Sequence, residues 1–283
     1  MANQGTTRPF AVITGASRGI GAEYARVLAS RGYDLLLVAR DRARLEQLAA
    51  EIAGRHQVQA DIALLELSEP EAAHRLYQAA RERRAAVDLL INNAGFGAVG
   101  DFIAMPMARI QAMLRLHVNT VVESCRLFLP GMVERRFGVI INVASTAGFL
   151  PIASMTEYAA TKSFLIAFSE ALAEEVRPAG LRIQVCCPGA TLTDFHQTAG
   201  SHPPGPFKAQ TAEAVVAASL DALGSGRTVV TTNWSGTLTD WLGRWVPRGL
   251  LARGAAWWMR RSKTGREAQS RKRNAESGKQ GGN

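Results

Sequence analysis

Short runs of residues that are apolar at nearly every position recur along this chain, and most are followed by a segment whose apolar residues follow helical spacing. Strands that are apolar throughout are covered on both faces, and their alternation with helices is typical of parallel pairing through right-handed crossovers. The sequence therefore predicts an α/β fold: a single doubly wound, parallel, seven-stranded sheet with helices on both faces. The strands are expected at 10–14, 33–39, within 58–67, and at 87–92, 138–143, 181–187 and 227–232.

The segments between these strands predict the helices and the domain boundaries. The helices are expected at 20–31, around 45–52, and at 70–84, 108–136 and 157–177, with Pro178 and Gly180 ending the last of them. We find no internal repeat and no linker in the body, so 10–232 is predicted to be one domain. Residues 1–9 are expected to be flexible, 233–262 form an extension rich in Trp and Arg, and 263–283 are expected to be a basic, disordered tail.

Composition and charge narrow the classes of protein that remain. A hydrophobic fraction of 47% with 20% charged residues is ordinary for a globular protein. The chain has no run of 18 apolar residues and no apolar segment of the signal-peptide kind, and its three cysteines (Cys125, Cys186, Cys187) lack metal-ligand spacing. We therefore expect a cytoplasmic protein with reduced thiols and no metal site.

The net charge of +9 is confined to the C-terminal end. Residues 244–283 hold 11 of the 33 Lys and Arg but only 2 of the 24 Asp and Glu. The body is balanced, which argues against a nucleic-acid-binding body and makes the C-terminal segment a separate question.

A glycine-rich turn, Thr14-Gly15-Ala16-Ser17-Arg18-Gly19-Ile20-Gly21, joins the first strand to the first helix. Its glycines allow a sharp turn and a close approach of the backbone to a ligand, while the helix N-terminus offers unpaired N–H groups to a pyrophosphate. A glycine-rich turn without a ligand is the alternative. Its position after the first strand favours a dinucleotide site in a Rossmann-like fold.

The second strand ends in Arg40, where sites for NAD carry an acidic residue on the ribose 2′-hydroxyl. A guanidinium pairs with a 2′-phosphate, and Arg18 lies in the glycine turn on the same side. Both arginines could be ordinary surface charges, and the adjacent Asp41 weakens the inference. We nevertheless predict NADP(H) as the cofactor.

Tyr158 and Lys162 lie one helical turn apart on the same face of a predicted helix. An adjacent ammonium is expected to lower the pKa of a phenol, so that Tyr158 could exchange a proton with a carbonyl compound or alcohol near neutral pH. Such pairs are also common on plain helix surfaces. Ser145 follows the fifth strand, and the segment Asn92-Asn93-Ala94-Gly95 ends the fourth, so both are expected at the same edge of the sheet.

Taken together, these motifs resemble the short-chain dehydrogenase/reductase family over about 10–232. They comprise the TGxxxGxG turn, the NNAG segment, Asn119 within the long helical stretch, Ser145 thirteen residues before the YxxxK motif of Tyr158 and Lys162, and Pro188-Gly189 after the sixth strand. The resemblance implies Tyr158 as the acid/base, Lys162 as the group that lowers its pKa and holds the nicotinamide ribose, and Ser145 as the group that polarises the carbonyl. It implies that Asn119 holds a water in a proton relay.

The resemblance also implies a cofactor site. Asn93 and Gly95 would line the adenine-ribose side, and Thr193 would cap the carboxamide or pyrophosphate side. An Asp often contacts adenine after the third strand of the family; here Glu66, or the backbone of Leu67, is in its place. The expected cofactor residues are Gly15, Ser17, Arg18, Gly19, Ile20, Gly21, Arg40, Glu66, Leu67, Asn93, Ala94, Gly95, Tyr158, Lys162, Pro188, Gly189, Thr191 and Thr193.

The substrate end is predicted from apolar residues near the catalytic set, although several could simply belong to the core. Phe96, Phe149 and Phe195 are expected to contact a lipophilic substrate together with Ser145 and Tyr158. Leu150, Ile152 and Met155 are candidates for the same wall. Residues 192–208, with His196 and His202, have the composition of a mobile lid, in which His196 is not expected to act as a catalyst.

All five tryptophans lie between Trp234 and Trp258, interleaved with arginines. This composition suits contact with an anionic membrane surface. Packing on the body or on a second subunit is an equal alternative, and nucleic-acid binding is a third.

The sequence thus predicts an NADP(H)-dependent oxidoreductase that moves a hydride between nicotinamide and a carbonyl or secondary alcohol. A non-catalytic dinucleotide sensor or scaffold on the same fold is the alternative, against which the complete Ser145, Tyr158 and Lys162 set argues. By analogy with the family we expect a homo-oligomer, with a small-molecule substrate and no nucleic-acid partner.

Overall fold

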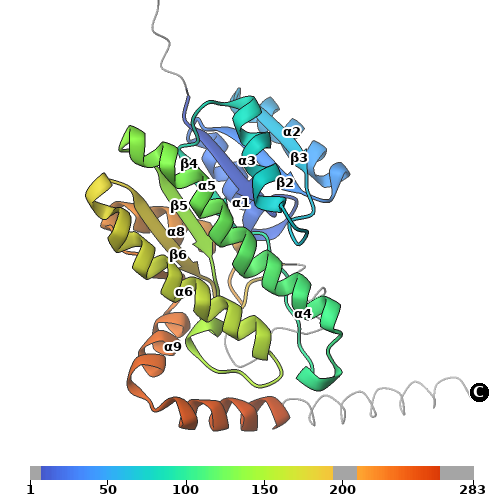
Figure 1. Cartoon of the computed structure of the whole chain (residues 1–283), viewed down its shortest axis with the longest axis vertical. Coiled ribbons are helices and arrows are strands. Elements are labelled where there is room, and N and C mark those ends of the chain that lie inside the picture. Colours follow the sequence, from blue (N-terminus) through green and yellow to red (C-terminus); the bar gives the residue numbers. More distant parts are fainter. Residues whose placement is uncertain (1–7, 194–208, 262–283) are drawn as a thin grey trace, which may run out of the picture.

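In the computed structural model, which describes residues 8–193 and 209–261, the chain forms a seven-stranded sheet whose strands all run parallel (Figure 1). The strand order is β3-β2-β1-β4-β5-β6-β7, so the order reverses beside β1. The strands are β1 (Phe10–Thr14), β2 (Asp34–Ala39), β3 (Ala60–Leu64), β4 (Leu89–Asn92), β5 (Val139–Val143), β6 (Arg182–Cys187) and β7 (Val229–Thr231). The predicted doubly wound α/β fold is confirmed.

Helices cover both faces of this sheet. They are α1 (Gly19–Ser30), α2 (Arg42–His56), α3 (Ala72–Arg83), α4 (Met107–Leu114), α5 (Thr120–Arg135), α6 (Thr156–Val176), α8 (Ala212–Ala222) and α9 (Trp234–Trp245). The helical stretch predicted at 108–136 is divided, because a π-helical turn at Arg115–Asn119 separates α4 from α5. A further helical segment follows Pro247 and covers 248–261.

Alternate residues of each central strand pack on opposite helical layers. Leu36 of β2 belongs to a buried cluster with residues of α3, α5 and α6, whereas its neighbours Leu35 and Leu37 belong to a second cluster with residues of α1, α2 and α8. The uniformly apolar strands are therefore explained by two cores, one on each face of the sheet.

The predicted N-terminal segment, residues 1–9, ends in contact with the sheet. Pro9, placed in the flexible N-terminal segment, accepts a hydrogen bond at its carbonyl from Asp34 N at 2.9 Å. Residues 1–7, 194–208 and 262–283 lie outside the described residues. Within the part of the chain that the structure describes, none of the helices is long and apolar enough to cross a membrane.

Candidate active site

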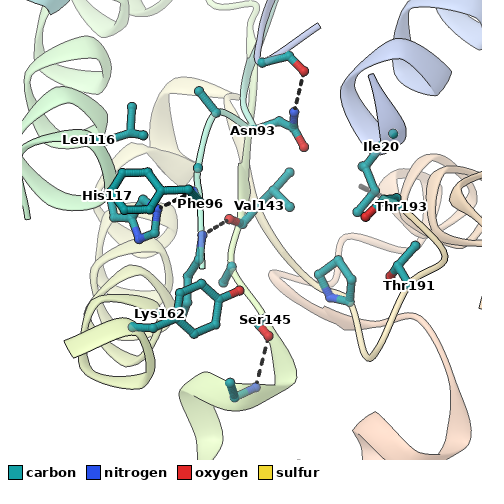
Figure 2. A pocket seen from close by; sticks show the side chains of 18 of the residues that line it. Ile20, Asn93, Phe96, Leu116, His117, Val143, Ser145, Lys162, Thr191 and Thr193 are labelled. Carbon is teal, nitrogen blue, oxygen red and sulfur yellow. Dashed lines mark hydrogen bonds between the residues drawn. The ribbon is translucent and has the colours of Figure 1, made fainter. Parts of the chain in front are cut away.

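A cavity of about 1020 Å³ opens at the carboxyl ends of the central strands (Figure 2). It lies beside the reversal of strand order, which is where open α/β sheets bind ligands. His117, Phe96, Lys162 and Ser145 lie on one side of it, and Ile20, Thr191 and Thr193 lie on the other (Figure 2). All the predicted cofactor residues except Gly21 line the cavity.

The glycine turn has the backbone that the sequence predicts for a phosphate-binding turn. Gly15 and Gly19 have φ angles of +66° and +56°, which favour glycine. Gly21 lies beneath the turn, where a Cβ atom would come within 2.3 Å of the Gly15 carbonyl oxygen. The first turn of α1 contains no acidic side chain, so its N–H groups and partial positive charge face the cavity without a competing carboxylate.

Asn93 holds this turn in place. Its Nδ2 donates to the Thr14 carbonyl oxygen at 2.9 Å and to the Gly15 carbonyl oxygen at 3.2 Å. Thr14 Oγ1 in turn accepts from the backbone N–H groups of Asn93 and Ala94. The side-chain amide of Asn93 is therefore engaged by the turn, although the residue lines the cavity as the resemblance implies.

The segment after β6 closes the opposite side of the nucleotide site. The Pro188 carbonyl accepts from Thr146 N at 2.9 Å, which fixes the chain as it leaves the sheet. Thr193 lies so close to the glycine turn that a Cβ atom at Gly19 would be 3.0 Å from its Cγ2. Thr193 and the glycine turn thus meet at this side of the cavity, which both of them line.

At the adenosine end, Arg40 and Glu66 form an ion pair, with 2.8 Å between Nη1 and Oε2. The other carboxylate oxygen of Glu66 accepts from Ser68 N at 3.0 Å and from Ser68 Oγ at 2.7 Å. Partial burial raises the pKa of Glu66, but the hydrogen bonds from Ser68 and Arg40 outweigh it and hold the pKa below its ordinary value. Leu67 also lines this end.

Asp41, which follows Arg40, is engaged by its own helix. Its carboxylate accepts from Arg44 N at 3.1 Å as the N-cap of α2, and it lies 3.3 Å from Arg44 Nε. Arg18 and Arg44 line the cavity beside Arg40. Three arginines thus line this end of the cavity.

Tyr158, Lys162 and Ser145 come together at the other end of the cavity. Tyr158 and Lys162 extend from α6, and both are buried. Lys162 Nζ donates to the Val143 carbonyl oxygen at 2.9 Å and lies 5.8 Å from the centre of the Tyr158 ring. The Ser145 hydroxyl accepts from Ala147 N at 3.1 Å and is hydrogen-bonded to the Tyr158 side chain.

The protonation states differ from the sequence-based expectation. Burial raises the pKa of Tyr158 to about 12, although the hydrogen bond with Ser145 opposes the rise. Burial also lowers the pKa of Lys162 to about 8. The expectation that Lys162 lowers the pKa of Tyr158 is therefore wrong for the protein alone, because the cost of burying a phenolate dominates. With this pKa, the Tyr158 hydroxyl is protonated at neutral pH.

His117 is a site residue that the sequence analysis missed. It is fully buried and lines the cavity. Its Nε2 accepts from Phe96 N at 3.2 Å, and Nδ1 lies 3.1 Å from Thr161 Oγ1, which donates to the Tyr158 carbonyl oxygen. Burial and the nearby Lys162 hold the pKa of His117 well below its ordinary value. A neutral imidazole therefore links the loop after β4 to the catalytic helix, with the proton assigned to Nδ1 from these partners.

Asn119, predicted as the fourth catalytic residue, does not take part in this network. It is exposed and does not line the cavity. Within the π-helical turn, Leu116 and His117 are buried, whereas Asn119 is exposed.

The substrate end contains some of the predicted residues. Phe96 lines the cavity, as do Leu150, Ile152 and Met155. Phe149 does not line the cavity. It packs against the core, and its carbonyl oxygen would lie 2.7 Å from a Cβ atom at Gly243. Phe195, His196 and His202 lie outside the described residues, as does most of the predicted lid.

Two further segments supply walls that sequence reasoning did not assign. Val99, between β4 and α4, and Arg109 of α4 contribute one wall, and Ser235, Thr239 and Met259 contribute another from the C-terminal extension. Met259 is only 8% exposed. The extension is therefore part of the cavity.

The bridging position of His117 leads to a stability prediction. His117→Ala should lower the free energy of unfolding by about 1–3 kcal/mol, because the partly buried Phe96 N–H loses its acceptor. His117→Gln places an amide oxygen near the position of Nε2 and should recover part of this loss. Denaturant unfolding of both variants checks the expectation, and an Ala variant as stable as the wild type would contradict it.

Curated relatives match most of this domain. The chain is 34% identical over 194 residues to the probable oxidoreductase EphD of Mycobacterium tuberculosis, a match covering 68% of this chain but only 33% of that protein. It therefore spans about a third of the length of these EphD relatives. It is 33% identical over 219 residues to the very-long-chain 3-oxoacyl-CoA reductase of Anas platyrhynchos, covering 76% of this chain and 69% of that protein.

Solved structures match the fold. A short-chain dehydrogenase from Sphingobium yanoikuyae in complex with NADPH superimposes with a TM-score of 0.76 and 33% identity, covering 80% of this chain and 88% of that one. A short chain dehydrogenase/reductase from Burkholderia phymatum in complex with NAD gives a TM-score of 0.74 and 26% identity, covering 83% and 92% of the two chains. Structures with either nicotinamide cofactor are thus similar to this chain.

The family model for short chain dehydrogenases matches residues 9–204, which include the glycine turn, Ser145, Tyr158 and Lys162. This match agrees with the parallel sheet, the strand order and the position of the cavity. The chain belongs to the short-chain dehydrogenase/reductase family.

Proposed function

We propose that this protein is an NADP(H)-dependent oxidoreductase that interconverts a lipophilic carbonyl compound and its secondary alcohol. The observation that carries the proposal is the single cavity that joins the glycine turn and three arginines at one end to Ser145, Tyr158 and Lys162 at the other. When bound, the nicotinamide cofactor would supply or accept the hydride.

The protein's own residues would orient the substrate and move the proton. Tyr158, protonated at neutral pH, would donate its hydroxyl proton to the carbonyl oxygen as negative charge develops there. Ser145 would hydrogen-bond the same oxygen, which the contact between the two hydroxyls supports. Lys162 uses one of its three donors on the Val143 carbonyl oxygen, which leaves two for the hydroxyls of a ribose.

A lipophilic substrate is supported by the walls of the cavity around this trio. Phe96, Leu150, Ile152, Met155 and Met259 surround the catalytic end with carbon and sulfur atoms. One relative is named as a reductase of very-long-chain 3-oxoacyl-CoA, and one solved structure is titled as an alcohol dehydrogenase specific for bulky ketones. Both names fit a wide apolar cavity.

The experiment that tests this function is a panel of ketones, aldehydes and 3-oxoacyl thioesters assayed by oxidation of NADPH and of NADH. We expect turnover with apolar ketones and a preference for NADPH. Lack of turnover across the panel, with the cofactor shown to bind, would favour a protein that binds the dinucleotide without catalysis.

The arginines at the adenosine end give a prediction for cofactor preference. Arg40→Asp should reduce the ratio of kcat/KM for NADPH to that for NADH by about 10- to 100-fold, because a charge-assisted contact with the 2′-phosphate is replaced by repulsion. Arg42→Asp is a matched control, since Arg42 pairs with Glu46 and does not line the cavity. An unchanged ratio in the Arg40 variant would contradict the assignment of Arg40 to the ribose 2′-phosphate.

The raised pKa of Tyr158 predicts different pH dependences for the two directions. Oxidation of an alcohol needs the phenolate, whose fraction rises about tenfold per pH unit below the pKa of about 12. Reduction needs the phenol, which predominates throughout this range. Oxidation should therefore rise between about pH 6 and 9, while reduction does not. Initial rates in both directions check this, and an oxidation rate that is flat with pH would contradict it.

We also propose that the protein acts in the cytoplasm as a homo-oligomer, by analogy with the family. Light scattering coupled to size-exclusion chromatography measures the oligomeric state directly.

A further inference from the structure

Helix α9 presents an apolar stripe to the outside of the molecule. Trp234, Leu238, Trp241 and Trp245 follow one face of the helix, and their side chains are 70%, 41%, 54% and 73% exposed. Exposed aromatic residues at this density are unusual on a surface that faces only water.

The body of the protein fixes the direction of this stripe. A Cβ atom at Gly236 would lie 2.9 Å from Thr146 Cγ2, and one at Gly243 would lie 2.7 Å from the Phe149 carbonyl oxygen. The helix is therefore anchored through its opposite face by close backbone contact. The tryptophan face cannot turn inward without loss of this contact.

The helical segment over 248–261 continues the same surface. Leu250 and Trp257 are 59% and 56% exposed, whereas Met259 points into the cavity. Both helices lie at the lower end of the molecule in Figure 1, with the segment before α4 at the same end. That segment carries Phe102 and Ile103, and α4 begins with Met107; all three residues are also exposed.

The charges on this surface are mostly positive. Residues 234–261 contain five arginines, all exposed (Arg244, Arg248, Arg253, Arg260 and Arg261), and one acidic residue, Asp240, which pairs with Arg244 at 2.8 Å. A symmetric contact with a second copy would bring two such cationic surfaces together. An anionic lipid surface is complementary both to the arginines and to the indole rings, which prefer the depth of lipid headgroups.

We propose that α9 and the helical segment over 248–261 dock on an anionic lipid surface, and that the substrate cavity opens beside this surface. Because Ser235, Thr239 and Met259 of these helices line the cavity, docking places its entrance next to the lipid. A lipophilic substrate could then pass between the bilayer and the cavity without crossing water. This last step rests on the proposed function, whereas the docking itself does not.

The test is flotation of the full chain with phosphatidylcholine vesicles, with and without about one third phosphatidylserine. We expect binding to the anionic vesicles that weakens as salt is added. The double variant Trp241→Ser/Trp245→Ser should lose at least about tenfold in vesicle affinity. Phe137→Ser is the matched control, because Phe137 is 53% exposed just before β5, at the amino end of that strand, and should bind as the wild type does.

Charge reversal provides a second, independent arm. Each arginine removed by Arg248→Glu and Arg253→Glu should cost about fivefold in affinity for anionic vesicles. Arg42→Glu, on the exposed surface of α2, is the control. Thermal unfolding and NADPH binding establish that each variant is folded.

Three results would overturn the proposal. The first is a full chain that does not float with anionic vesicles. The second is a tryptophan double variant that floats like the wild type. The third is a stable dimer that dissociates in this variant while neither protein binds vesicles, which would assign the stripe to a second copy. Reduction of a water-soluble ketone, measured in the same preparations, separates membrane docking from the proposed function. Activity without flotation rejects docking but not the function. Flotation without ketone reduction rejects the proposed function but not docking.

Discussion

Tyr158→Phe is expected to lower kcat for carbonyl reduction by about 10²- to 10⁴-fold, the range typical for loss of a general acid. The ring of Tyr158 is buried and packs edge-on against His117, with 5.9 Å between ring centres, so phenylalanine should fill the same space. Binding of NADPH, measured by fluorescence titration, should therefore change little. The expected result is a defect in turnover with an intact cofactor site.

Tyr77→Phe is the matched control for this variant. Tyr77 packs on Phe128 in the core and does not line the cavity, so removal of its hydroxyl should leave turnover unchanged. If Tyr158→Phe kept kcat within a few fold of the wild type, another group would have to supply the proton, and the assignment of Tyr158 as the acid would be wrong.

Gly21→Ala should damage both the fold and the cofactor site, although it adds only one methyl group. That group would lie 2.3 Å from the Gly15 carbonyl oxygen and 2.6 Å from Asn93 Nδ2, so the glycine turn itself must move. We expect a loss of about 1–3 kcal/mol in the free energy of unfolding. We also expect a loss of at least about tenfold in NADPH affinity, because the N–H groups that face the pyrophosphate shift with the turn.

Gly54→Ala is the same substitution at a position where we expect the free energy of unfolding to rise and not to fall. Gly54 lies in α2 with no atom within 4 Å of the added Cβ, so alanine should stabilise the protein by about 0.5–1 kcal/mol. Chemical unfolding and NADPH titration of both variants check the pair. Normal NADPH binding by Gly21→Ala would mean that the turn does not contact the cofactor.

The fold was predictable from sequence because the strands are buried on both faces. A strand such as Asp34–Ala39 is apolar after its first residue, and no helix with one exposed face has that pattern. The glycine turn, Ser145, Tyr158 and Lys162 were predictable for a related reason. The spacing of Tyr158 and Lys162, together with the positions of the glycine turn and Ser145 after strands, predicts one edge of the sheet as the site.

The rest of the site depends on information that is not local in the sequence. Asn119 and His117 are two residues apart, and the choice between them requires knowing which face of the helical stretch is buried next to the π-helical turn. The sign of the pKa shift of Tyr158 depends on how completely the ring is buried, which residue types alone do not reveal. Met259 lines the cavity because the chain returns to it about a hundred residues after Tyr158, which local sequence patterns do not show.

That return has a consequence for how selectivity could diverge among similar enzymes. Tyr158 and the glycine turn come from the first two thirds of the chain, whereas one wall of the cavity comes from the helix that ends the described part. Substitutions at Met259 or its neighbours would reshape which molecules fit while Ser145, Tyr158 and Lys162 stay in place. Under the proposed function, a shortened version that lacks this helix would act differently on bulky compounds, even with these three side chains intact.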